Sequence, residues 1–315
     1  MFKKNDYTNM VLTTLYKMLL LLCSICSLFY FSACEKVIDI DVKANQPQLV
    51  VEAYINNEIP QYNYVVLSRS QNYFAPDFQS IPVKNALVTI TEGVQNNNQQ
   101  YVWNAATTRV LKEVNNATIP AIFRNGVYFD TMLFVNINQA LKGNIGKAYL
   151  LNITEGGNNY TAITKLIQPV PIDSLTIGFE FLNDSNQRQV RITNNYKDPD
   201  TLGNAQFYFW RFSSNSKSFG WGAFTKSRAP GTDDLNNGEY IRLTHPQGFS
   251  VNDTVNYFMA SVTRDVYQFW DSFNKARDNN GAFSTPVTLR TNISGPNVTG
   301  CFSGYALSTK TIITR

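Results

Sequence analysis

Short runs of β-branched and aromatic residues, separated by polar turn residues, recur along most of this chain and limit what it can fold into. Gln48 to Ile55 reads QLVVEAYI, Ala86 to Thr91 reads ALVTIT, and Ala205 to Phe212 reads AQFYFWRF. Runs of this length and composition are typical of β-strands. Because many short strands with closely spaced turns favour packed sheets, we expect an all-β fold made of sandwich-like parts.

One segment carries a helical pattern instead. Val266, Trp270 and Phe273 recur at the spacing of a single helix face. They lie within Asp265 to Asp278, and the Asn279-Asn280-Gly281 run that follows is a stop signal for a helix. The pattern predicts one short helix near residues 265–278.

The N-terminus has the pattern of an export signal. Lys3, Lys4 and Lys17 precede an apolar run from Met18 to Phe31, which is shorter than the roughly 20 residues that a membrane-spanning helix needs. The run ends in Phe31-Ser32-Ala33-Cys34, which resembles the lipobox of bacterial lipoproteins, although Leu is usual where Phe31 stands. We therefore expect a lipoprotein signal peptide over residues 1–33 and a lipid on Cys34. An uncleaved membrane helix is the alternative.

Two prolines mark the clearest boundary further along, in Gln168-Pro169-Val170-Pro171, because they favour a stiff, extended connection. We expect an N-terminal Ig-like β domain over residues 34–168. A C-terminal β domain that contains the helix would then cover residues 169–315. The 282 residues that remain after residues 1–33 suffice for two domains of ordinary size.

Composition argues against several classes of protein. Without residues 1–33, the chain keeps 24 basic and 22 acidic residues and has no basic stripe, so we expect no nucleic-acid partner. Of the four cysteines, only Cys34 and Cys301 remain. With Cys34 committed to lipid, no intramolecular disulfide can form, and we expect Cys301 to be a buried apolar residue.

No set of residues points to a reaction. His245 is the single histidine, which is too few for a histidine zinc site, and we expect it in a loop. The carboxylate pairs could offer oxygens to Ca²⁺, but none matches an EF-hand loop, and solvated loop charges are the favoured interpretation. These pairs are Asp39/Asp41, Asp198/Asp200 and Asp233/Asp234. We expect no catalytic residues, no metal, no cofactor and no enzymatic activity.

Two long polar loops carry several aromatic residues. Residues 68–83 contain Tyr73, Phe74 and Phe78, and residues 213–238 contain Phe219, Trp221 and Phe224. Aromatic side chains in polar loops often make contacts with partners or ligands. The alternative is that they pack beneath their own loops as small satellite cores. We take these six residues as candidate ligand or partner contacts.

Several motifs together resemble one protein family. They are Cys34 to Asp41 (CEKVIDID), Pro82 to Ile90 (PVKNALVTI), Asp198-Pro199, Tyr267 to Trp270 (YQFW) and Asn292 to Gly295 (NISG). With them, nearly all of the mature chain is similar to the Bacteroidota lipoproteins catalogued as domain of unknown function 4249. The tail departs from the family pattern at Gly300 to Tyr305. The resemblance implies an outer-membrane lipoprotein encoded near TonB-dependent receptors, with no described catalytic residues.

The leading hypothesis is a lipid-anchored outer-membrane binding or accessory protein that works with a TonB-dependent receptor in the capture or uptake of a small ligand or peptide. Two alternatives stay open. A structural envelope or adhesion protein with Ig-like modules would be an elongated rod. A hydrolase with an unrecognised site would bring two carboxylates together. The sequence leaves open whether the body faces the periplasm or the cell surface.

Overall fold

The computed structural model describes residues 4–30, 47–71, 81–114, 125–213, 225–226, 231–232, 237–279, 285 and 287–315. The chain divides into two compact units, Met1–Asn45 and Gln46–Arg315. The first unit contains helix α1 (Lys4–Tyr30), and the second contains all the described strands. Within the described residues, no helix combines the length and the apolar character that crossing a membrane requires.

The second unit consists mainly of strands, which confirms the predicted all-β fold class. Fourteen described strands form one large curled sheet, in the order β14-β13-β18-β20-β1-β2-β6-β5-β3-β7-β8-β19, with β15 on β13 and β4 on β3. Their bounds are β1 (Leu49–Asn56), β2 (Tyr64–Arg69), β3 (Leu87–Gln95), β4 (Tyr101–Trp103), β5 (Arg109–Glu113), β6 (Val127–Phe129), β7 (Ala148–Glu155), β8 (Asn158–Lys165), β13 (Ala205–Phe212), β14 (Thr225–Lys226), β15 (Gly231–Thr232), β18 (Thr254–Val262), β19 (Ile293–Ser294) and β20 (Val298–Ile313).

The remaining described strands form two small antiparallel sheets. One contains β10 (Phe181–Leu182), β11 (Arg188–Val190) and β17 (Phe249–Ser250), and the other contains β9 (Ser174–Ile177), β12 (Ile192–Lys197) and β16 (Tyr240–Thr244). Single 3-10 turns complete the connections: η1 (Pro60–Tyr62), η2 (Ala105–Thr107), η4 (Thr131–Phe134) and η5 (Ile137–Gln139).

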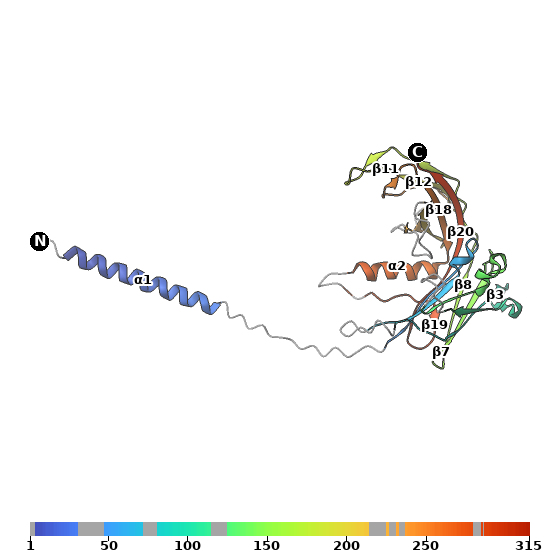
Figure 1. The fold of residues 1–315 in the computed structure, drawn as a ribbon, viewed down its shortest axis with the longest axis horizontal. Helices are drawn as coiled ribbons and strands as arrows, with labels where there is room; N and C mark the ends of the chain where they lie inside the picture. The colour runs from blue at the N-terminus through green and yellow to red at the C-terminus, as the bar shows by residue number, and fades with distance from the viewer. Residues whose placement is uncertain are drawn as a thin grey trace. The chain divides into compact units, whose positions relative to one another are not determined.

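Strand β20 holds the large sheet together. Its first half pairs in parallel with β1, and its second half pairs antiparallel with β18, so all three lie side by side (Figure 1). Gly300 permits the close approach to β1, because a Cβ there would lie 1.9 Å from the carbonyl oxygen of Val51. The division at residues 168/169 stays a prediction, and across it the C-terminal strand β20 pairs with the N-terminal strand β1.

Two apolar cores follow from the alternation of side chains along β1. Val51 and Ile55 point into a core between the β1, β2 and β20 layer and the β3, β7 and β8 layer, which gives this part its sandwich-like character. Tyr54 points the opposite way, into a second core. A third core lies under β13 and β18 and is covered by the small sheet of β12.

Helix α2 (Arg264–Asp278) confirms the predicted short helix. It lies along the concave side of the curled strands β18 and β20 (Figure 1). The predicted apolar face is displaced in the structure, because Val266 and Phe269 are buried whereas Phe273 remains 38% exposed. Trp270 is half-buried and donates its indole N–H to the Ser303 hydroxyl at 3.0 Å. A hydrogen-bond partner on β20 therefore helps to set the helix rotation.

Candidate functional site

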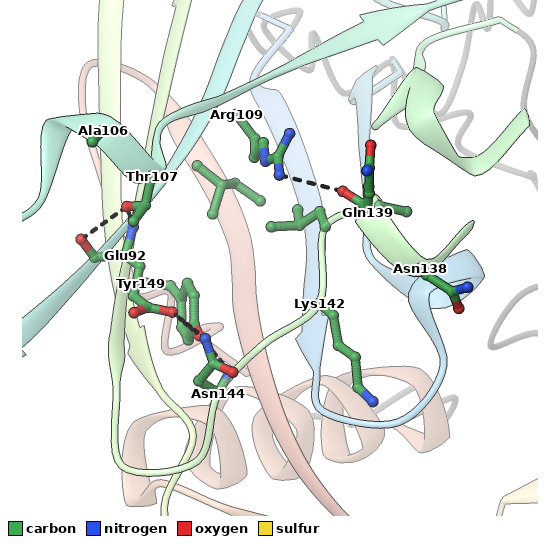
Figure 2. Close-up of a pocket in the computed structure, with 12 residues that line it drawn as sticks. Glu92, Ala106, Thr107, Arg109, Asn138, Gln139, Lys142, Asn144 and Tyr149 are labelled. Carbon is green, nitrogen blue, oxygen red and sulfur yellow. Dashed lines mark hydrogen bonds between the residues drawn. The ribbon is translucent and has the colours of Figure 1, made fainter. Parts of the chain in front are cut away.

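A cavity of about 350 Å³ opens beside strands β3, β5 and β7 (Figure 2). We call it the Glu92 pocket. Three charged side chains line it, from Glu92 on β3, Arg109 on β5 and Lys142 in the connection to β7. The uncharged lining residues are Ile90, Ala106, Thr107, Asn138, Gln139, Ala140, Leu141, Asn144 and Tyr149. Small-ligand sites span about 300–1,000 Å³, so this cavity is at the lower end of the usual size.

One wall of the pocket is the loop over residues 130–144, which a buried carboxylate holds in place. Asp130 is 5% exposed and accepts backbone N–H groups from both ends of the loop, from Met132 at 3.0 Å and from Leu141 at 2.8 Å. The buried amide of Asn63 donates to the Leu141 carbonyl at 2.7 Å. Gly143 N–H donates to the Asn56 carbonyl at 2.8 Å. The loop is therefore tied both to itself and to the β1–β2 connection.

The opposite wall is a tight turn before β5. In η2, the Asn104 side chain accepts the Ala106 backbone N–H, which caps this 3-10 turn. The Thr107 hydroxyl donates to the Asn104 carbonyl at 2.7 Å and accepts the Glu92 backbone N–H at 3.1 Å. The turn thereby positions the start of β5, and Arg109 is the first residue of that strand.

The carboxylate of Glu92 sits in a small hydrogen-bond network (Figure 2). Its Oε2 accepts from the Tyr149 hydroxyl at 2.9 Å and from the Asn144 side-chain amide at 2.7 Å. The same hydroxyl accepts the Asn144 backbone N–H at 2.5 Å. Burial raises the pKa of Tyr149 well above its usual value, and the Glu92 carboxylate adds to the rise. The phenol therefore stays protonated and keeps donating to Glu92.

The cationic side chains of the pocket are far less engaged. Arg109 donates from Nη2 to the Gln139 carbonyl at 3.3 Å, across the gap between β5 and the loop (Figure 2). Lys142 is exposed and makes no hydrogen bond or ion pair to the described residues. Within that part of the chain, neither cation pairs with Glu92. One cavity thus presents a fixed negative group and two positive groups that do not neutralise it.

A second cavity, of about 460 Å³, lies beside the N-terminal end of α2 and the edge strands β8 and β19. Two of its polar side chains hold local structure. Asn292 bonds the backbone of Phe302 through both its amide nitrogen and its oxygen, and Thr291 donates to the Gly300 carbonyl at 2.7 Å. In the Glu92 pocket, by contrast, two neighbouring side chains hold a carboxylate in place, so we take that pocket as the candidate site.

The single histidine lies away from both cavities. His245 is in the loop between β16 and β17, and it is fully buried. Its Nε2 shares a 2.6 Å hydrogen bond with the Tyr257 hydroxyl, and burial lowers its pKa to about 4. Among the described residues, no group of three or more His, Cys, Asp or Glu side chains could hold a metal ion.

The site residues predicted from the sequence all lie outside the described residues. This applies to the lipidation site Cys34 and to the aromatic loop residues Tyr73, Phe74, Phe78, Phe219, Trp221 and Phe224. The structure therefore leaves those assignments as predictions. The Glu92 pocket was missed, because its residues come from four separate segments and carry no motif. Cys301 was expected to be buried, and it is 1% exposed.

The sequence matches the family model described as domain of unknown function 4249 over residues 35–311. The chain belongs to this family. A comparison with curated proteins found no match. Among solved structures, the chain is similar to one titled "Cytokine receptor complex - Crystal form 1A", at 8% identity, with 84% of this chain and 96% of that chain covered. The TM-score is 0.23, which is too low to support any argument about fold or function. DUF4249 membership is thus the relationship that these comparisons establish.

Proposed function

We propose that this DUF4249 protein is a binding protein of the cell envelope that captures a small polar ligand in the Glu92 pocket. The observation that carries the proposal is the set of unneutralised charges around one cavity. Specific ligand sites are concave and hold a few precisely placed polar groups, and the hydrogen-bonded Glu92 carboxylate is such a group.

We further propose that the protein is attached to the outer membrane by lipid on Cys34. The support is the sequence Phe31-Ser32-Ala33-Cys34 after a short apolar run. Each methylene of an acyl chain buried in a membrane contributes about 0.8 kcal/mol, and stable attachment takes more than one chain. A multiply acylated Cys34 would hold the body at the membrane for long periods.

The proposed partner is a TonB-dependent receptor, and the support for it is family resemblance. A protein fixed in the same membrane as its partner has a high effective concentration toward it, so even a modest interface suffices. Ligand captured in the pocket would then be delivered close to the receptor. The predicted contact residues are Phe219, Trp221 and Phe224, together with Tyr73, Phe74 and Phe78.

We propose that the protein is not an enzyme. Glycoside hydrolysis uses two carboxyl groups that flank the bond to be cleaved. Glu92 is the one carboxylate in the described lining of its pocket, and two neutral donors already bond it. This arrangement supports binding better than acid–base catalysis.

The test of attachment compares Cys34→Ala with the matched control Cys23→Ala, which changes another cysteine of the same N-terminal region. We expect radiolabelled palmitate to enter the wild type and the control but not Cys34→Ala, and the receptor to co-purify with the first two alone. Palmitate entering Cys34→Ala would show that the lipid is elsewhere. A receptor that never co-purifies with a properly lipidated protein would refute the partnership.

A further inference from the structure

We propose that the Glu92 pocket binds a small zwitterion, of a size between an amino acid and a dipeptide, so that the ligand's ammonium group meets Glu92 and its carboxylate meets Arg109 and Lys142. This ligand class depends on the proposed binding function and makes it specific. The described residues use only part of the hydrogen-bonding capacity of the pocket, on its negative and its positive side.

The negative side of the pocket is the Glu92 carboxylate, which can accept further hydrogen bonds from a ligand. Tyr149 and Asn144 both donate to Oε2 of Glu92, at 2.9 and 2.7 Å. Within the described part of the chain, Oε1 accepts no hydrogen bond. A carboxylate accepts only, with about four lone-pair sites, so Glu92 keeps acceptor capacity for an ammonium group with three donors. Because two neighbours fix its position, little further ordering is needed on binding.

The positive side of the pocket consists of Arg109 and Lys142, and most of their N–H donors are not used by the described residues. Arg109 uses one of its five N–H donors, to the Gln139 carbonyl at 3.3 Å. The remaining donors suit a carboxylate, which a guanidinium binds with two parallel hydrogen bonds. Lys142, which is exposed, adds an ammonium group to the same lining. An arginine with unused donors, together with a lysine in the same lining, favours an anionic group of carboxylate size.

Within the described residues, Glu92 forms no ion pair with Arg109 or Lys142. This favours a zwitterion over a neutral ligand, a simple anion or a simple cation. If Glu92 paired with Arg109, their charges would cancel, and the pocket would suit a neutral ligand. Within the described residues, they form no such pair. A simple anion would leave Glu92 facing it with the same charge, and a simple cation would leave Arg109 and Lys142 likewise opposed. A dipolar ligand satisfies both sides.

The volume and the apolar lining set the size of the ligand. At about 350 Å³ the cavity has room for an amino acid or a dipeptide and little beyond it. Ile90, Ala140 and Leu141 are among the apolar residues of the lining. This surface suits short aliphatic side chains, so alanylalanine is a suitable probe.

The experiment is calorimetric titration of the full chain with three matched ligands. Alanylalanine carries both charges, N-acetyl-alanylalanine carries only the negative one, and alanylalaninamide carries only the positive one. We expect alanylalanine to bind at least about tenfold more tightly than either blocked form, because each blocked form leaves one charged side unpaired. Equal affinity for alanylalanine and a blocked form would overturn the proposal, as would the absence of binding by all three at millimolar concentration.

Two variants then assign the two ends of the ligand. Glu92→Gln keeps an acceptor for Tyr149 and Asn144 but removes the charge, and it should weaken alanylalanine at least about tenfold without weakening N-acetyl-alanylalanine. Arg109→Gln should weaken alanylalanine without weakening alanylalaninamide. Lys112→Gln is the control, because Lys112 is an exposed cation on the same strand outside the lining. Equal losses for all three variants would mean a non-specific charge effect and would refute the assignment.

Failure of this inference is distinguishable from failure of the proposed function. Receptor co-purification depends on attachment and on the partner surface, and it is measured without added ligand. Intact co-purification with no preference for alanylalanine over its blocked forms would overturn the ligand class alone. Preference for alanylalanine without receptor co-purification would support the ligand class and refute the partnership.

Discussion

The buried histidine makes folding stability depend on pH in a way that the structure specifies. His245 is fully buried among four aromatic rings, whose centroids lie 5.0 Å (Trp210), 5.4 Å (Tyr257), 5.8 Å (Tyr208) and 6.5 Å (Phe249) from its own. Its Nδ1 has no hydrogen-bond partner in the described part of the chain. A charged imidazole there would lose its hydration without gaining a counter-ion, so the folded protein holds this ring neutral.

The sign and the size of the effect follow from linkage. Burial lowers the pKa of His245 from 6.5 to about 4. Below pH 6.5 the unfolded chain takes up a proton at this residue, and the folded chain does so only near pH 4. The stability that the neutral ring contributes is therefore complete above pH 6.5 and is lost as the pH falls toward 4. At about 1.4 kcal/mol per pH unit, the loss over this window is about 3 kcal/mol.

The assay is urea unfolding near pH 7 and near pH 4, for the wild type and for His245→Gln. Carboxylates titrate in the same window in both proteins, so the difference between the two proteins isolates the histidine. We expect the wild type to lose about 3 kcal/mol more than His245→Gln between the two pH values. Tyr257→Phe is the control: it removes the Nε2 partner and should lower stability by about 1 kcal/mol at both pH values, with the pH dependence retained. Identical pH dependence in the wild type and His245→Gln would refute the reasoning.

Three further predictions concern the loop, the buried thiol and the aromatic loop. Asp130→Ala should lower the free energy of unfolding, measured by urea denaturation, by about 3 kcal/mol, because two buried backbone N–H groups lose a charged acceptor. Asp130→Asn should lower it by less, and equal losses for the two variants would contradict this. Burial raises the pKa of Cys301 to about 12, so iodoacetamide should modify it far more slowly in folded protein than in protein unfolded by urea, as mass spectrometry of its peptide would show; equal rates in the two states would rule this out. Trp221→Ala should leave the melting temperature unchanged and abolish receptor co-purification, whereas a loss of about 3–5 kcal/mol would place Trp221 in a core.

Much of the strand content was predictable, because each strand carries its own local pattern. Ala205 to Phe212 was expected as an apolar strand and is β13 with the same bounds. Gln48 to Ile55 was expected as a strand, and β1 covers Leu49–Asn56 and contributes to two cores. Local periodicity reports which faces of a strand are buried, and that information lies within a few residues of sequence.

Local periodicity does not indicate which strands pair with one another. Near the C-terminus, residues 298–313 form the single long strand β20. Its glycines, Gly300 and Gly304, suggest turns, but each fits against a close backbone neighbour instead. Its pairing with β1 joins residues about 250 positions apart, and no local pattern encodes such a contact.

The Glu92 pocket could not be predicted from the sequence, because it too is formed by contacts between residues far apart in the chain. The same long-range contacts support its assignment as a ligand site. Glu92 and Tyr149 are 57 residues apart, and Asn63 and Leu141 are 78 apart, so the pocket exists only after β3, β7 and the loop over residues 130–144 have packed together. Side chains that meet through such long-range packing are held by the rigid sheet rather than by the loop alone. A charged group held in this way loses little freedom when a ligand arrives, so its charge is available for recognition. Neutralising the charge of Glu92 should therefore change ligand affinity while the Asp130 contacts keep the loop in place.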